Sequence, residues 1–138
     1  MYAFDQTRSF DETRAAHENL LDNGAIHLLA RRADRDVGLL TIEQTTPAPR
    51  LCTADFPYIG PTATNPEARG SGVGRALVGA SFTWARTHGH QTIAVDFDSA
   101  NLLSRPFWIG NGFRPTGHRL RRILAVRPTE LPMRQADI

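Results

Sequence analysis

The sequence predicts a mixed α/β (α+β) domain with a twisted, mostly antiparallel sheet, one parallel strand pair and helices on both faces. Two alternating stretches, residues 26–33 and 37–44, flank a tight turn and predict a β-hairpin. Apolar residues recur at helical spacing and form one stripe of a predicted helix: Val73, Ala76, Leu77, Ala80 and Trp84. A further alternating stretch follows at 93–98. Because a strand, a helix and a second strand form a right-handed crossover, we expect the strands on either side of this helix to be parallel.

The composition is that of one globular domain. The 138 residues are 41% hydrophobic and 22% charged, enough for one sizeable core and too few for two. We treat residues 1–138 as a single domain, with its core at 26–126 and a tail at 127–138. The basic residues are all arginine and the net charge is only +2, which argues against a nucleic-acid partner. We interpret the short run of Arg31 and Arg32 as a solvated strand face. Cys52 is the single cysteine, and no apolar run is long enough to span a membrane, so we expect a soluble, cytoplasmic protein without a membrane partner.

The first predicted helix, residues 10–22, is marked at both ends. Ser9 and Glu12 form a capping-box pattern, in which each side chain accepts a hydrogen bond from the other residue's backbone N–H. Gly24 is typical of a helix end. The hairpin follows, with its turn at residues 34–36. We expect the apolar side chains of the helix to face the core: Phe10, Ala16, Leu20 and Leu21.

The extended stretch at residues 51–65 contains prolines that limit its pairing. Pro57 and Pro61 have no backbone N–H to donate, so they mark an edge, a bulge or a place where strands part. Beyond the strand at 93–98, a short helix is predicted at 105–111, because Pro106 is tolerated in a first helical turn. Residues 114–126 are predicted to be extended.

A glycine-rich turn precedes the second long helix and is suited to binding an anion. Gly70, Gly72 and Gly74 alternate in E-A-R-G-S-G-V-G-R-A-L. Glycine lets a ligand approach main-chain N–H groups, and a helix start adds unpaired donors and the positive end of the dipole, so we expect a phosphate here. The chain has no lysine, which excludes a P-loop, G-x-x-x-x-G-K-[ST], and the G-x-G-x-G spacing at mid-chain differs from that of a dinucleotide fold, G-x-G-x-x-G. A glycine-rich helix start without a ligand is the alternative.

Two motifs together resemble the GNAT superfamily of N-acyltransferases. The loop matches the acyl-CoA pyrophosphate signature [RQ]-x-x-G-x-[GA] at Arg69, Gly72 and Gly74. The pattern N-x-x-A-x-x-x-Y-x-x-x-G-F then aligns without a gap on residues 101–113, with Trp108 where a tyrosine is usual. The resemblance covers roughly residues 26–126, with abbreviated ends, and implies a GNAT fold whose parallel strands splay apart around the cofactor.

The resemblance implies acetyl-CoA (CoA) as the cofactor and transfer of its acetyl group to an amine by direct attack. The loop backbone and its arginines would hold the pyrophosphate, and the strand before the loop would hold the pantetheine arm. Asn101 would hydrogen-bond the cofactor and Trp108 would pack beneath it. No metal is expected. The cofactor-binding residues are thus Ala63, Thr64, Arg69, Gly70, Ser71, Gly72, Val73, Gly74, Arg75, Asn101 and Trp108.

The catalytic residues are not singled out by the sequence. An indole N–H cannot protonate a leaving thiolate as the usual tyrosine does, so Trp108 is expected only to pack. Asp55 and Glu43 are candidate bases because they lie on strands that lead to the gap. His27 and His118 are candidates because their pKa suits the task. Ser104 is a nearby donor.

The partner suggested by the family is an amine, either a small molecule or a peptide. Two alternatives to an enzyme stay open: a non-catalytic acyl-CoA-binding or regulatory module, and a structural domain completed by another subunit. The abbreviated ends also predict a homodimer, because an uncovered sheet edge can pair with another chain.

Overall fold

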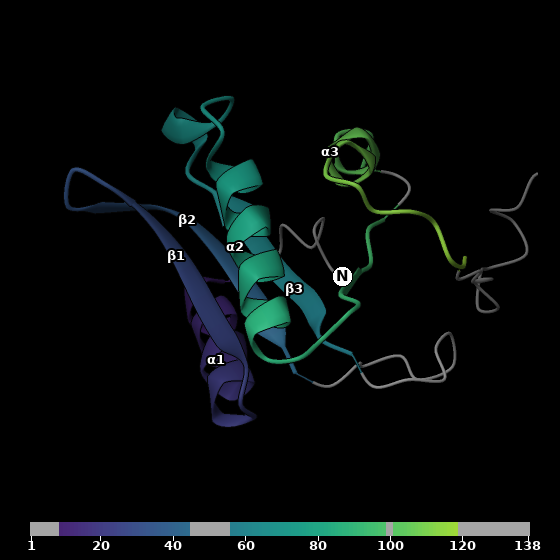
Figure 1. The fold of residues 1–138 in the computed structure, drawn as a ribbon. Helices are drawn as coiled ribbons and strands as arrows, with labels where there is room; N and C mark the ends of the chain where they lie inside the picture. The colour runs from purple at the N-terminus through teal and green to yellow at the C-terminus, as the bar shows by residue number, and fades with distance from the viewer. Residues whose placement is uncertain (1–8, 45–55, 99–100, 119–138) are drawn as a thin grey trace, which may run out of the picture.

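The computed structural model describes residues 9–44, 56–98 and 101–118 (Figure 1). Predictions for Cys52, Asp55 and residues 119–138 lie outside this part of the chain. In chain order the elements are α1 (Phe10–Asp22), β1 (Ile26–Arg32), β2 (Arg35–Glu43), β3 (Tyr58–Thr64), the 3-10 turn η2 (Pro66–Ala68), α2 (Val73–Thr87), β4 (Ala94–Val95) and α3 (Ser104–Gly110).

The described strands form one mixed sheet in the order β1-β2-β3-β4. Neighbours β1, β2 and β3 are antiparallel, whereas β3 and β4 are parallel. The parallel register joins Tyr58 to Ala94 and Ile59 to Val95 only, so β3 parts from β4 beyond Ile59. Helix α2 crosses one face of the sheet, and α1 lies behind the other (Figure 1). The predicted fold class, including the splayed parallel pair, is confirmed.

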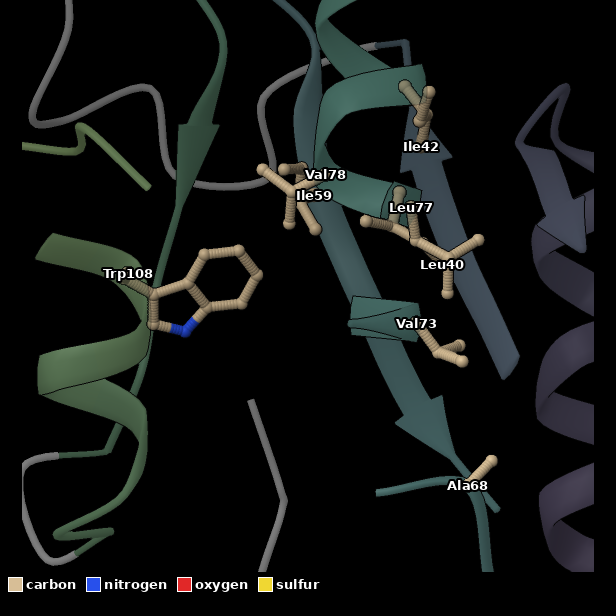
Figure 2. Close-up of a cluster of buried hydrophobic side chains, with 8 residues drawn as sticks. All are labelled: Leu40, Ile42, Ile59, Ala68, Val73, Leu77, Val78 and Trp108. Atoms are coloured by element: carbon tan, nitrogen blue, oxygen red, sulfur yellow. The ribbon is translucent and has the colours of Figure 1, made fainter. Parts of the chain in front are cut away.

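The core lies between α2 and the sheet. Leu40, Ile42 and Ile59 supply the sheet side of this core, and Figure 2 shows the α2 side chains packed over them. The buried face of α2 differs from the predicted stripe, because Ala76 and Ala80 are exposed. The helix instead buries a stripe shifted around its axis, made by Val73, Leu77, Val78, Ser81 and Ala85.

Helix α1 has the predicted bounds and the predicted capping box, but its packing was predicted wrongly. Phe10 is 79% exposed and Leu21 is 46% exposed, and no residue of α1 is buried. The half-buried residues are Ala16, His17 and Leu20. Phe10 and Leu21 lie roughly 80–100° around the helix from Leu20, so a helix that touches the sheet along one narrow stripe leaves both outside.

The boundaries of the hairpin turn, of β4 and of α3 differ from the predicted ones. The hairpin turn falls on Ala33 and Asp34, with φ of 46° and 64°, rather than on residues 34–36. Strand β4 contains only Ala94–Val95 instead of 93–98, because β3 diverges and removes its hydrogen-bonding partner. Helix α3 runs over Ser104–Gly110, one residue earlier than predicted.

Candidate functional site

The glycine-rich loop joins η2 to the first turn of α2. Gly70 and Gly72 have φ of 73° and 86°, a left-handed conformation that side chains with a Cβ rarely adopt. Gly72 is the N-cap of α2 and offers no side-chain acceptor to the first turn. The N–H donors at the start of α2 therefore stay open to a ligand, at the positive end of the helix dipole.

A hollow of about 290 Å³ lies over this loop. It brings together backbone donors, two guanidinium groups and one aromatic ring from α3. Of the predicted cofactor-binding residues it includes seven, and it adds Ala68 and Phe107, which the sequence did not indicate. The lining residues are Thr64, Ala68, Arg69, Gly70, Gly72, Val73, Gly74, Arg75 and Phe107.

The three glycines of the motif have different structural roles. No atom lies within 4 Å of a Cβ built on Gly70 or Gly72, so these two positions need glycine for their backbone conformation. A Cβ on Gly74 would lie 3.2 Å from the ring of Phe107. Gly74 thus allows α3 to approach α2 closely, which closes one side of the hollow.

Ser71 braces the loop and does not line the hollow. Its hydroxyl donates to the carbonyl oxygen of Ala68 at 2.5 Å and accepts from Nη2 of Arg32 at 3.1 Å. The Asn65 backbone N–H donates to the carbonyl oxygen of Val37 at 2.8 Å, which ties the strand before the loop to β2. The loop is therefore held by contacts with both of its neighbours, η2 and the β1–β2 hairpin.

Besides Ser71, three predicted cofactor-binding residues lie outside the lining of the hollow. Ala63 is exposed on β3. The Asn101 side chain accepts from the Leu103 N–H at 3.2 Å, in the turn that leads into α3. Trp108 is only 5% exposed and points from α3 towards Ile59 and Val78 (Figure 2).

The aromatic residue in the hollow is therefore Phe107, and Trp108 holds α3 against the core. The Trp108 ring packs edge-on against Phe107 and Phe113, with centroids 4.9 and 5.4 Å away. The motif over residues 101–113 contains both aromatic residues. The signal that separates them is the rotation of α3, which the motif alone does not specify.

Among the candidate bases that the structure describes, Glu43 lies nearest to the point where β3 and β4 part. It is the last residue of β2 and pairs with Tyr58. Its carboxylate occupies the position that a Cβ on Gly60 would take, directly after the last residue of β3 that pairs with β4. Partial burial raises the pKa of Glu43.

Tyr58 and Asp96 complete a polar group around Glu43 that the sequence did not indicate. The pKa of Tyr58 is raised far above its usual value, mainly because the side chain is buried and also because its hydroxyl hydrogen-bonds with the Asp96 carboxylate. The negative charge of Glu43 raises it further. Tyr58 therefore stays neutral, between two carboxylates.

The other catalytic candidates within the described segments lie away from the strand gap. His27 Nε2 is 3.4 Å from Nδ1 of His17 on α1, and the pKa of His27 is lowered by burial and by the charge of His17. Ser104 is half-buried at the start of α3, and His118 is exposed. The structure thus brings Glu43 towards the strand gap and leaves the histidine pair between α1 and β1.

The described segments 9–44, 56–98 and 101–118 offer neither a metal site nor a membrane-spanning helix. They contain no cluster of three or more histidine, cysteine, aspartate or glutamate side chains able to hold a metal ion. Within the same segments, each helix is too short or too polar to cross a bilayer.

Comparison with solved structures confirms the fold. An aminoglycoside 6'-N-acetyltransferase, AAC(6')-IG from Acinetobacter haemolyticus, superposes with a TM-score of 0.73 at 19% identity, over 88% of this chain and 85% of that one. AAC(6')-Iy in complex with a bisubstrate analogue, CoA-S-monomethyl-acetylneamine, gives 0.72 at 18% identity, over 88% and 84%. A transcriptional regulator from Bacillus halodurans C-125 gives 0.65 at 22% identity, over 87% and 79%.

Comparison of the sequence identifies the family. No curated protein sequence matches the chain significantly. The model of the acetyltransferase (GNAT) family, however, matches residues 2–113, which is most of the chain. The resemblance of the two sequence motifs, with the acetyl transfer from acetyl-CoA that it implies, is thereby confirmed. The chain belongs to the acetyltransferase (GNAT) family.

Proposed function

We propose that the protein transfers the acetyl group of acetyl-CoA to a primary amine of a small cationic molecule. The observation that carries this proposal is the hollow at the N-terminus of α2, which is lined by open backbone donors and by Arg69 and Arg75. It lies where β3, no longer paired with β4, runs into the loop. A polyanionic cofactor with a long extended arm fits both features.

We assign each part of the cofactor to residues along the hollow and the unpaired edge of β3. The N–H groups of Gly70, Gly72 and Val73, with the two guanidinium groups, bind the pyrophosphate. The pantetheine arm runs along the freed edge of β3 at Ala63 and Thr64, and Asn101 hydrogen-bonds it. The thioester then reaches towards the end of the gap, near Gly60.

Glu43 is the residue best placed to accept a proton from the amine. The amine nitrogen attacks the thioester carbonyl carbon, the carbon–sulfur bond breaks, and the proton lost by nitrogen passes to the Glu43 carboxylate, directly or through water. The thiolate leaves as CoA and takes a proton from solvent. A pKa raised by burial makes this carboxylate a stronger base than an exposed one.

The acceptor class follows from the charges at the same end of the gap. Glu43 and Asp96 flank the neutral Tyr58, so a positively charged molecule is favoured there over a neutral one. The structural neighbours AAC(6')-IG and AAC(6')-Iy, which are aminoglycoside N-acetyltransferases, support an amine of this class. A peptide amine is the less favoured acceptor.

Release of free CoA tests this proposal directly. The purified protein is mixed with acetyl-CoA and a panel of amines: aminoglycosides, linear polyamines, a basic peptide and neutral amines. We expect turnover with the small cations first, and calorimetry should show CoA binding without an acceptor. Binding without turnover over the whole panel would instead support the second candidate, a CoA-binding regulatory module, which Trp108 at the usual tyrosine position favours. Absence of CoA binding would contradict both.

We also propose that the protein is a cytoplasmic homodimer. The edge of β1 that faces away from β2 pairs with no other described strand, and such an edge can accept a second chain. The single cysteine suits a reducing compartment. Sedimentation should show a dimer at micromolar concentration, and a monomer at millimolar concentration would contradict this part of the proposal.

A further inference from the structure

Arg32 lies far from the glycine-rich loop in the sequence, but in the structure its positive charge lies beside this loop. Its Nη2 donates to the Ser71 hydroxyl at 3.1 Å, across 39 residues of sequence. The neighbouring Arg31 is different, because its Nε forms an ion pair with Asp36 at 2.9 Å. Within the described segments, no carboxylate forms such a pair with Arg32. Its charge is thus uncompensated beside the loop.

The contact between the hairpin and the loop is built into the packing. A Cβ on Gly38 would lie 2.6 Å from Val73 and 3.0 Å from Leu77, so only glycine lets the first turns of α2 rest on β2 at this point. The bond from Asn65 N–H to Val37 at 2.8 Å holds the end of β3 to the same strand. These contacts place the end of the hairpin, with Arg32, against the loop.

Arg32 meets the loop from outside the hollow. Arg69 and Arg75 line the hollow and Arg32 does not. A guanidinium held by a neutral hydroxyl keeps further N–H donors for a second partner, and its planar geometry matches the oxygens of a phosphate or a carboxylate. Coenzyme A carries a second phosphorylated group besides the pyrophosphate, the ribose 3'-phosphate.

We propose that Arg32 binds the ribose 3'-phosphate of CoA and so lets the protein distinguish CoA from dephospho-CoA. This inference rests on the proposed function, because it assigns one more residue to the same cofactor. The pyrophosphate stays with the loop and its two arginines, and the 3'-phosphate lies on the hairpin side of the loop. Ser71 is the residue that positions the guanidinium between them.

Calorimetry with two ligands and two variants tests the assignment. Arg32→Ala should bind CoA about tenfold more weakly than the wild type, the scale of one charge-assisted contact to phosphate, and should bind dephospho-CoA as the wild type does. Arg31→Ala is the matched control and should leave both affinities unchanged. Thermal unfolding of both variants should match the wild type, because both side chains are exposed.

Any other result counts either against the assignment of Arg32 or against the proposed function. An equal loss of affinity for CoA and dephospho-CoA in Arg32→Ala would show that Arg32 acts on the pyrophosphate or on the shape of the loop, and would overturn the assignment. Unchanged affinity for CoA in Arg32→Ala would overturn it as well. A wild-type protein that binds neither ligand would contradict the proposed function itself.

Discussion

Replacement of Gly72 tests whether the loop binds a phosphate. We compare Gly72→Asp with Gly72→Asn, which have nearly the same shape and differ by one negative charge. Both side chains have room, because nothing lies within 4 Å of a Cβ at this position. Both also tolerate the left-handed backbone, φ 86°, better than other residues do. Any cost to folding is therefore shared, and the comparison isolates the charge.

The expected loss follows from the repulsion between the new carboxylate and the pyrophosphate. Gly72 is exposed and lines the hollow, so water screens most of the interaction. Two unit charges about 4 Å apart repel by about 1 kcal/mol in bulk water and by about 4 kcal/mol at a dielectric of about 20. Two phosphate charges at the exposed limit thus cost about 2 kcal/mol, or about 30-fold in Kd.

Calorimetry with CoA at low and high salt measures this effect. Gly72→Asp should bind at least about 30-fold more weakly than Gly72→Asn, and the ratio should shrink as salt rises because the charges are exposed. Circular dichroism and thermal unfolding check that both variants are folded. Equal CoA affinity in the two folded variants would refute a phosphate at this loop.

Four further substitutions test the proposed catalytic roles and the packing of the core. Trp108→Phe should keep most activity if the fold survives, since Trp108 packs in the core; a loss of ~100-fold or more in CoA release, typical of lost proton transfer, would contradict a packing role. Glu43→Gln should lower kcat by about 100-fold or more. In the wild type kcat/KM should rise with pH as the Glu43 carboxyl group loses its proton. The midpoint of this rise should lie above the pKa of an ordinary glutamate, because burial raises the pKa of Glu43. If kcat/KM of Glu43→Gln still rises with pH in the same way, Glu43 is excluded as the base. Thr41→Val should raise the free energy of unfolding by about 1 kcal/mol, because the buried Thr41 hydroxyl has no hydrogen-bond partner among the residues that the structure describes. Ser81→Ala should lower it by about 1 kcal/mol, because the equally buried Ser81 hydroxyl donates to the Val78 carbonyl at 2.7 Å; denaturant titration that shows the same sign for both changes would refute this account.

The sequence alone determined the features that depend on neighbouring residues. The capping box of Ser9 and Glu12 predicted the start of α1, because its two hydrogen bonds join residues three apart. The alternating glycines predicted the loop and the start of α2, because a left-handed N-cap such as Gly72 is a local backbone requirement. The two motifs also predicted the family, since their spacing reflects one strand, one loop and two helices in order.

Only the tertiary structure decided which faces of these elements are used. Apolar residues of α1 were predicted to be buried by pattern, yet Phe10 and Leu21 are exposed because the sheet covers a narrow part of the helix. The motif over residues 101–113 did not specify which of two adjacent aromatic side chains reaches the hollow. The rotation of α3 puts Phe107 there and Trp108 in the core.

The arginine pair at the end of β1 shows most clearly that the sequence alone did not determine which face of an element is used. In the sequence Arg31 and Arg32 are equivalent members of one basic run, and we interpreted the run as a solvated strand face. In the structure Arg31 pairs with Asp36 on the neighbouring strand, whereas Arg32 reaches Ser71 in the loop before α2. Alternation along a strand sends two adjacent side chains to opposite faces. Which face of β1 meets the glycine-rich loop depends on how α2 packs on the sheet, and this packing is set by residues far away in the chain.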